Sequence, residues 1–520
     1  MIKNFKKNKV YNIYKLILFL IFSSLFLPQV FLLNEDINLI LAYEVDPGSL
    51  ITSINALFKF PYYNMFNGYH TTSYGWTYAS LTFLFLLPFK LIFFIFKIDS
   101  TFFIILLIRF VFYLIGLFSV FILFRLCRKV LGTKNLIINF LLVVLFIFSP
   151  FNNLFYFLHP ETTGILFTFL AANYLFDYVN KSKIFYYYYS FICLVLAALS
   201  KQQFFISSIF LSIFLFFIFY KKNKIILLSS VFFKELIKVF LLSLLILFFI
   251  HPYAFLMPFN FFISQISLGT GFTVNTNLNF LDTFILWVNV YKSSSLFLFS
   301  TILNILNIII IFQKKNSTIE KIFNFTLFLI VVFTIFYFSI GNKNNIGFNY
   351  YQAIYPIIIL QLLLFLKTIS DLSFFNKIQL KILFIFLLLY FPIYNFGSTI
   401  KSLQQRFLYK EGISYRSYEY IKENLSFNDK IANDHHVAVP FFMKDISCHY
   451  WHSCNNYNKI LSFQPNYVAF LDPLPVWGWS ENLEGKALKK YTEDQKMKLV
   501  KIIDDKNSNS KIFIFKLDIY

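Results

Sequence analysis

The chain has 520 residues, of which 58% are hydrophobic and 22% aromatic, while only 14% are charged. A soluble globular protein averages about 25% charged residues, and a soluble core with so little polar surface could not hide 76 phenylalanines and 34 tyrosines. These values exclude an ordinary soluble domain. Apolar runs of about 18 or more residues recur as far as roughly position 400, which predicts a polytopic α-helical membrane protein.

The basic residues behind the net charge of +21 cluster in short breaks between the apolar runs, such as "RLCRKVLGTK", "YKKNK" and "QKKNSTIEK". Lysine and arginine in short breaks of this kind are typical of the cytoplasmic loops of membrane proteins. The charge therefore predicts an orientation in the membrane, and we expect no nucleic-acid partner.

The first apolar run covers residues 14–33 and follows a basic segment. It is long for a signal peptide, and no small-residue cleavage site follows it, so we expect an uncleaved anchor with a cytoplasmic N-terminus. The polar loop 35–75 then lies outside the cytoplasm. It carries Glu44 and Asp46 in "LAYEVDPGSL" and His70 in "GYHTTSYGW".

Asp46 precedes a Pro-Gly pair, and aspartate in that position favours a turn. The turn accounts for Asp46 but leaves Glu44 unexplained. The functional alternative is a carboxylate that accepts a proton from an attacking hydroxyl group. Both interpretations stay open at this level.

Later apolar runs predict further membrane crossings, with roughly 11–13 transmembrane helices in all. The segment 77–97 breaks the alternation, because counting it as a crossing would place "RLCRKVLGTK" outside. We expect it to lie along or re-enter the outer interface with a bend at Pro88, unless two crossings are merged elsewhere, for which 283–312 is the obvious place. The other predicted crossings are 101–125, 135–157, 163–180, 184–200, 203–220, 230–250, 283–312, 322–341, 352–367 and 378–397.

With "RLCRKVLGTK" in the cytoplasm, and with successive helices crossing the membrane in alternate directions, several polar groups lie on the outer face. Each has a simple structural explanation: His159 and Glu161 start a helix, Lys201 snorkels to the interface, and tyrosines form an aromatic belt. An outer lysine nevertheless departs from the positive-inside pattern, and its compact charge suits the phosphate of a lipid-linked substrate. The candidates are His159, Glu161, Lys201, Gln202, Tyr350 and Tyr351.

Residues 1–398 form the membrane domain, and 399–520 form a polar domain that we predict to be a small α/β domain. "SYRSYEYIKENL" has helical spacing, and "KIAND", "NYVAFLD" and "KIFIFKLDIY" are predicted strands. No glycine-rich phosphate loop precedes a helix there, so no nucleotide site is expected. Cys448 and Cys454 form a disulfide or remain two free thiols, and the spacings in "CHYWHSC" do not match a zinc site.

Four segments carry a resemblance to a known family. "YEVDPGSLITSINAL" stands where that family has an acidic loop motif, and "YHTTSYGWTYASLTFLFLLPFKL" resembles the segment that follows it. "LHPETTGILFTFLAANYLF" resembles a later span with an acidic start, and "LAALSKQQFF" a span ending in a lysine. The whole architecture resembles the GT-C superfamily of integral-membrane glycosyltransferases, which includes the protein mannosyltransferase-like and aminoarabinose-transferase-like enzymes of family 39.

The resemblance implies transfer of a sugar from a polyprenyl-phosphate donor to a glycan, lipid or protein acceptor on the outer face, with inversion at the anomeric carbon. It implies that Asp46 is the general base, with Glu44 as second choice because the family often has adjacent acidic residues. It also implies that Lys201 meets the donor phosphate. His70, His159, Glu161, Gln202, Tyr350 and Tyr351 are the substrate-binding candidates.

No metal ligand is assigned, although a divalent cation stays open as a cofactor. The expected location is the bacterial plasma membrane, with the C-terminal domain outside the cytoplasm. Two other functions remain. A transporter or lipid flippase needs charged groups near the membrane midplane, whereas the apolar runs are nearly free of charge. A non-catalytic scaffold would bind a partner through its outer domain.

Overall fold

The computed structural model describes residues 2–32, 39, 54, 76–96, 101–132, 135–148, 159, 161–224, 229–250, 259, 279–313, 318–341, 348–371, 378–434, 437–440, 443–448, 457–472, 483–504 and 509–518. The chain divides into two compact units. Unit 1 consists of Met1–Val30, Ser53–Leu91 and Leu107–Ile400, and unit 2 of Phe31–Thr52, Ile92–Leu106 and Lys401–Tyr520.

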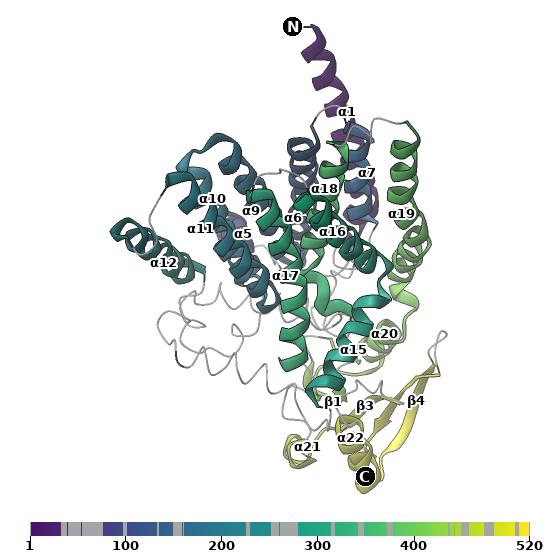
Figure 1. Cartoon of the computed structure of the whole chain (residues 1–520). Coiled ribbons are helices and arrows are strands. Elements are labelled where there is room, and N and C mark those ends of the chain that lie inside the picture. Colours follow the sequence, from purple (N-terminus) through teal and green to yellow (C-terminus); the bar gives the residue numbers. More distant parts are fainter. Residues whose placement is uncertain are drawn as a thin grey trace. The chain divides into compact units, whose positions relative to one another are not determined.

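Unit 1 is helical (Figure 1). Within the described residues, seven helices are long and apolar enough to cross a membrane: Val10–Phe31, Thr77–Phe96, Phe102–Leu131, Phe205–Asn223, Ser295–Gln313, Thr318–Ile340 and Tyr351–Ser370. This confirms the prediction of a polytopic helical protein. The helices are α1 Ile2–Phe26, α5 Trp76–Phe96, α6 Thr101–Leu131, α7 Leu136–Ile147, α9 Glu161–Lys181, α10 Ile184–Ala198, α11 Phe205–Asn223, α12 Ser230–Ile250, α15 Phe280–Ser293, α16 Ser295–Gln313, α17 Thr318–Gly341, α18 Tyr355–Ser370 and α19 Ile378–Phe407, with short 3₁₀ turns η1 Leu27–Phe31, η3 Gln202–Phe204 and η4 Phe348–Ala353.

Helices α1 and α6 run in opposite directions. The ring of Tyr11 in α1 stacks on that of Phe124 with centroids 5.1 Å apart. In η1, which follows α1, the carbonyl oxygen of Gln29 accepts a hydrogen bond from Arg109 Nη1 at 3.4 Å. The guanidinium of Arg128 lies 4.1 Å from the Tyr11 ring centroid. The basic end of α6 therefore lies beside the beginning of the chain, as the charge pattern predicts.

Helix α5 begins beside the part of α6 that follows residue 107. The hydroxyl of Tyr78 donates a hydrogen bond to the carbonyl oxygen of Ile108 at 3.0 Å. These two residues are thirty positions apart in the sequence and are neighbours in the structure. Helix α5 is long and apolar enough to cross a membrane. The prediction that the segment 77–97 lies along or re-enters the outer interface stays a prediction.

Lysines from two further basic segments, Lys181 and Lys222, lie at the end of unit 1 where Lys129 lies, named here the Lys129 end. Lys129 Nζ donates to Asp177 Oδ2 at 2.7 Å and to Asn173 Oδ1 at 2.6 Å. Lys222 Nζ donates to the carbonyl oxygen of Tyr178 at 2.8 Å. Cations at the C-terminal end of α9 satisfy its last carbonyl groups and complement the helix dipole, so this end is fixed by ion pairs and caps.

The apolar run 283–312 is divided in the structure. Helix α15 ends at Ser293 and α16 begins at Ser295, with Ser294 between them in an extended conformation. Both helices pack on α17, and α16 also packs on α18. The run is therefore not one helix, which bears on the crossing count but does not by itself add a crossing.

Residues 401–520 of unit 2 contain a five-stranded sheet of order β2-β1-β3-β5-β4. Strands β1 (Lys430–Asp434), β2 (Lys444–Cys448) and β3 (Tyr467–Asp472) are parallel, and β5 (Lys511–Lys516) runs antiparallel to β3 and to β4 (Lys498–Asp504). Three of these strands match the predicted ones, while β2 and β4 were not predicted. Both carry lysine and aspartate among their apolar residues, which weakens the strand pattern.

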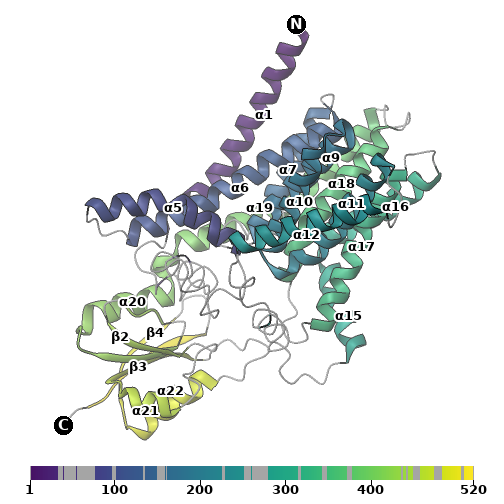
Figure 2. The ribbon, with the colours of Figure 1, turned by 90° about the vertical axis from the view of Figure 1, so that its left-hand side faces the viewer.

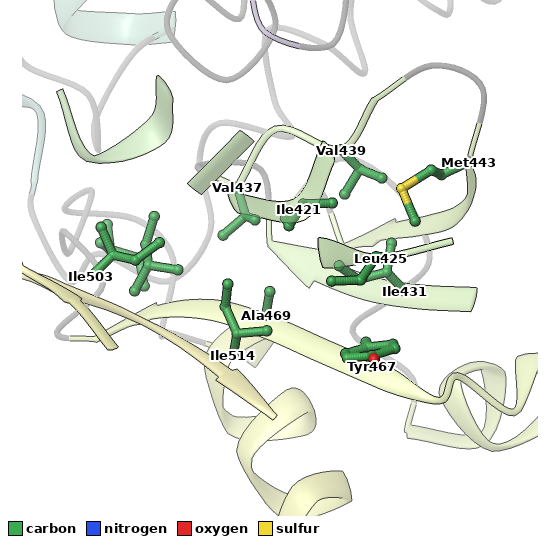
Figure 3. Close-up of a cluster of buried hydrophobic side chains, with 12 residues drawn as sticks. Ile421, Leu425, Ile431, Val437, Val439, Met443, Tyr467, Ala469, Ile503 and Ile514 are labelled. Atoms are coloured by element: carbon green, nitrogen blue, oxygen red, sulfur yellow. The ribbon is translucent and has the colours of Figure 1, made fainter. Parts of the chain in front are cut away.

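Helices cover both faces of this sheet. Helix α20 (Ile413–Asn424) lies on one face, and α21 (Tyr457–Phe463) and α22 (Leu483–Asp494) lie on the other (Figure 2). The first face is closed by a buried cluster that includes Ile421, Ile431 and Ile514 (Figure 3). A second cluster closes the opposite face. The prediction of a small C-terminal sheet is confirmed, and it has a three-layer arrangement.

We expect Asp429 to make this domain sensitive to acid. Burial raises the pKa of Asp429, but hydrogen bonds outweigh it: Ser426 donates its N–H at 2.6 Å and its hydroxyl at 2.9 Å, and Asn466 donates its amide at 2.6 Å. The pKa therefore lies below the ordinary 3.8. A lowered pKa contributes stability above the unfolded value, and this stability is lost as pH falls through the folded value.

Unfolding of the full chain should show this contribution when it is measured by the fluorescence of the C-terminal domain at several pH values. The Asp429→Asn variant should be less stable than the parent at neutral pH, and the difference should shrink as the pH falls below 3.8. A difference that stays constant with pH would contradict the assignment. Glu423→Gln, an exposed change on α20, is the control.

Candidate functional site

A buried ion pair joins the start of α9 to the turn after α10. Glu161 is the first residue of α9 and is 1% exposed. Lys201 Nζ donates a hydrogen bond to Glu161 Oε1, and His159 Nδ1 lies 3.5 Å from Glu161 Oε2. The structure therefore brings together three of the residues that the sequence singled out. The end of unit 1 that they occupy is named here the Lys201 end.

Local hydrogen bonds explain how each side chain is positioned. The N–H and the hydroxyl of Thr162 donate to the carbonyl oxygen of His159 at 3.2 and 2.8 Å, which starts the first turn of α9. A carboxylate in a first turn is favoured by the helix dipole. On the other side, Phe204 N–H donates to the carbonyl oxygen of Lys201 at 2.9 Å, which closes the turn η3. The turn thereby holds Lys201 against α9.

A close contact between Gly164 and Phe204 sets the distance between these two segments. A β-carbon on Gly164 would lie 2.5 Å from the Phe204 ring, which is fully buried. Real β-carbons essentially never come this near another heavy atom. Only glycine lets the ring pack against the first turn of α9, three residues after Glu161.

Burial differs across the ion cluster. The side chain of Glu161 is 1% exposed, whereas those of Lys201 and His159 are 17% and 21% exposed. The carboxylate of Glu161 is therefore buried, and it orients the partly exposed side chains of Lys201 and His159. An ammonium carries three N–H donors, so Lys201 can hold Glu161 and an anion at the same time.

Two further buried polar atoms lie next to this pair in sequence. Thr163 Oγ1 and Gln203 Oε1 are buried and have no hydrogen-bond partner within the described part of the chain. Buried polar atoms are nearly always hydrogen-bonded, so an unpartnered one indicates a site that a ligand or water completes. Gln203 stands beside Lys201 and Gln202 among the polar residues of the predicted outer face, whereas Thr163 was not predicted and its only signal was its nearness to Glu161.

Other elements meet at the Lys201 end. Thr77 Oγ1 donates to the carbonyl oxygen of Leu196 at 2.8 Å, which ties the start of α5 to the end of α10. The turn η3 contacts η4, which contains Tyr351. Tyr351 is fully buried, and its hydroxyl donates to the carbonyl oxygen of Trp287 at 2.7 Å. Tyr351 thus lies at the predicted end, but its contacts are those of an aromatic core.

A buried arginine in α6 lies at the same end and was not predicted. Arg109 is 4% exposed and neighbours Ile108, to which Tyr78 is bonded. The side-chain amide of Gln29, also 4% exposed, has no hydrogen-bond partner among the described residues. The sequence offered one signal, an arginine inside an otherwise apolar run, because a charge at membrane depth is costly and usually functional.

Several predicted residues cannot be placed. Glu44, Asp46 and His70 lie outside the described residues, as do the side chains of Gln202 and Tyr350. The backbones of the last two belong to η3 and η4. The predicted general base is thus still a prediction from sequence.

Cysteines and metal ligands are the remaining predictions. Cys127 and Cys193 are free and buried, whereas Cys454 lies outside the described residues, so the pairing of Cys448 is untested. Within the described ranges, no group of three or more His, Cys, Asp or Glu side chains could hold a metal ion.

No protein-family model matches the chain, and a comparison with curated proteins finds no match either. Function is therefore inferred from the residues of the Lys201 end and from the resemblance of the sequence motifs.

Proposed function

We propose that the chain is a GT-C-like membrane glycosyltransferase that transfers a sugar from a polyprenyl-phosphate donor to an acceptor outside the cytoplasm. The observation that carries the proposal is the Lys201–Glu161–His159 cluster, where a buried carboxylate orients two nitrogen groups at one end of the helical unit. The ammonium group of a lysine held at the end of the helical unit suits the phosphate of a membrane lipid.

The charge distribution supports the orientation. Lys129, Lys181 and Lys222 lie at the Lys129 end, together with the basic end of α6. Lysine and arginine are enriched on the cytoplasmic side, so the Lys129 end is assigned to the cytoplasm and the Lys201 end to the outer side. Counting α1, α6, α7, α9, α10, α11, α12, α16, α17, α18 and α19 as crossings gives eleven, with the C-terminal domain outside.

The proposed chemistry is a single displacement. A hydroxyl oxygen of the acceptor attacks the anomeric carbon, the bond from that carbon to the phosphate oxygen breaks, and polyprenyl phosphate leaves with inversion. Asp46 accepts the hydroxyl proton. Lys201 stabilises the negative charge that develops on the leaving phosphate, and Glu161 positions Lys201.

The proposal is tested with membranes from cells that lack the gene and carry it on a plasmid. The membranes are given polyprenyl phosphate bearing labelled mannose, glucose or aminoarabinose, and release of polyprenyl phosphate is measured. Release should depend on the gene and should fall by about 100-fold or more in Asp46→Asn, the scale of a lost general base. Equal release with and without the gene for every donor would refute the proposal, and a near-normal rate in Asp46→Asn would remove Asp46 from the base role.

A transport function is the second candidate, and one observation favours it. Polar side chains line the contact of α16 with α17 and α18: Asn307 Nδ2 donates to Asn324 Oδ1 at 2.7 Å, and Asn304 is fully buried with no partner in the described part of the chain. Reconstituted vesicles separate the two functions. Movement of a labelled polyprenyl-phosphate sugar between leaflets without release of polyprenyl phosphate would favour transport.

A further inference from the structure

A groove lies in the C-terminal domain between the second half of α22 and the strands β3 and β5, and it is named here the α22 groove. Its volume is about 510 Å³, which is within the range of small-molecule sites. Its floor is aromatic. The rings of Phe470 and Phe515 are stacked with centroids 5.7 Å apart, and the centroid of Phe513 lies 6.2 Å from that of Phe470.

The floor continues onto the edge strand β4. Residues that are directly opposite each other in an antiparallel pair point to the same face of the sheet. Ile502 of β4 is opposite Phe513, and Leu499 is opposite Phe515. Ile502 and Leu499 are 41% and 42% exposed. The aromatic floor is therefore open on the side of β4, so a ligand can reach it without a movement of α22.

One wall of the groove carries a lysine where glycine is usual. Helix α22 ends in a turn in which the N–H of Met497 donates to the carbonyl oxygen of Thr492 at 2.9 Å, and the N–H of Lys496 to that of Glu493 at 3.1 Å. Lys496 has a φ of 49° and takes the left-handed position of this motif, where a β-carbon is unfavourable. A lysine kept in this conformation favours a use for its side chain in the groove.

The charged residues of the groove limit its ligand. Lys489 and Lys496 supply N–H donors, whereas the carboxylates of Glu493 and Asp472 accept hydrogen bonds. Two charges of each sign disfavour a ligand with a net charge. An acyl chain would use only the aromatic floor and would take the charged rim out of water at a cost. A sugar fits both parts, because its ring has an apolar C–H face and its hydroxyl groups both donate and accept.

We infer that the α22 groove binds a neutral sugar of a glycan, with one ring on Phe513 and Phe515 and its hydroxyl groups on Glu493 and Lys496. If the proposed function holds, this sugar belongs to the acceptor, and that role rests on the proposed function. The binding itself does not need the transfer reaction.

The test is calorimetric titration of the full chain with maltotriose, mannotriose and triacetylchitotriose, in a detergent without a sugar headgroup, because a maltoside would compete. Glu493→Ala removes an exposed acceptor and should weaken binding by about tenfold, the scale of a hydrogen bond to a charged group. Phe515→Leu removes a flat ring and should weaken binding by about threefold or more. Glu423→Ala, on the exposed side of α20, is the matched control and should bind normally.

A glycine substitution separates binding from folding. Lys496→Gly suits the left-handed backbone, so it should raise the unfolding temperature of the domain while it weakens binding by about tenfold. Gln464 is also exposed, has a φ of 51° and follows α21 in the same domain. Gln464→Gly should therefore also raise the unfolding temperature but should bind like the parent.

Two results would overturn the inference. The first is no binding of any of the three trisaccharides, or an affinity that is unchanged in Glu493→Ala, Phe515→Leu and Lys496→Gly. The second is binding of laurate that depends on Phe515 without binding of the trisaccharides, which would assign the groove to an acyl chain.

Failure of this inference can be told apart from failure of the proposed function. Lys201→Met should bind the trisaccharides normally while it loses use of the donor. If the parent chain binds a trisaccharide in the groove but releases no polyprenyl phosphate, the sugar site stands and the enzyme assignment falls. If polyprenyl phosphate is released but no trisaccharide binds, the sugar site falls and the enzyme assignment stands.

Discussion

Lys201→Met is expected to destabilise the protein by about 3–5 kcal/mol and to weaken its use of the lipid-phosphate donor strongly. The substitution leaves Glu161 as a carboxylate in a nearly closed site, and removal of one partner from a buried pair costs this much. Glu161 is 1% exposed, so water cannot replace the lysine without rearrangement. Thermal unfolding in detergent measures the stability, and the donor concentration at half-maximal rate measures donor use.

A double variant separates the two roles of Lys201. Lys201→Met with Glu161→Gln leaves no buried charge, so it should recover most of the lost stability but none of the donor use. Lys181→Met is the matched control, because Lys181 is half exposed and its partner Asp177 keeps Lys129. An exposed pair contributes about 0–1 kcal/mol. If donor use in Lys201→Met matches the wild type, Lys201 does not bind the phosphate.

Gly164→Ala is expected to destabilise the Lys201 end by about 1–3 kcal/mol, the usual cost of overpacking a core. The added methyl group would lie 2.5 Å from the ring of Phe204, which is fully buried and cannot move into solvent. Because Phe204 closes the turn that begins at Lys201, donor use should fall together with stability. Both are measured as for Lys201→Met.

Two further variants provide a matched control for Gly164→Ala and a rescue of its effect. Gly397 lies in α19 with nothing within 4 Å of an added β-carbon, so Gly397→Ala should be neutral or stabilising by up to about 1 kcal/mol. Phe204→Leu should restore activity to Gly164→Ala, because it removes the ring that clashes. An unaltered Gly164→Ala protein, or a rescue that fails while Phe204→Leu alone is active, would show that this contact does not position Lys201.

The buried charges show where prediction from sequence reached its limit. Glu161 and Lys201 were singled out because both stand on the predicted outer face. A lysine there departs from the positive-inside pattern, and the segment that starts with Glu161 resembles an acidic-start span of the GT-C superfamily. Their pairing across forty residues was not predicted. Arg109 was not predicted although it stands inside an apolar run, because its hydrogen-bond partner, the carbonyl oxygen of Gln29 in η1, lies eighty residues away along the chain.

The sequence by itself determined the class of the protein and the direction of its charge asymmetry. Composition and long apolar runs require a lipid environment, and basic breaks identify one end of the helical unit, because these properties are summed over many residues. Three of the five strands could also be identified, since their β-branched and aromatic residues form a local pattern.

Only the tertiary structure decided which polar residues meet. The pair of Glu161 with Lys201, the contact of Gly164 with Phe204, and the hydrogen bond from the N–H of Leu471 to the carboxylate of Asp434 all join segments that are distant along the chain. A contact of this kind depends on packing geometry, which a pattern of neighbouring residues does not contain.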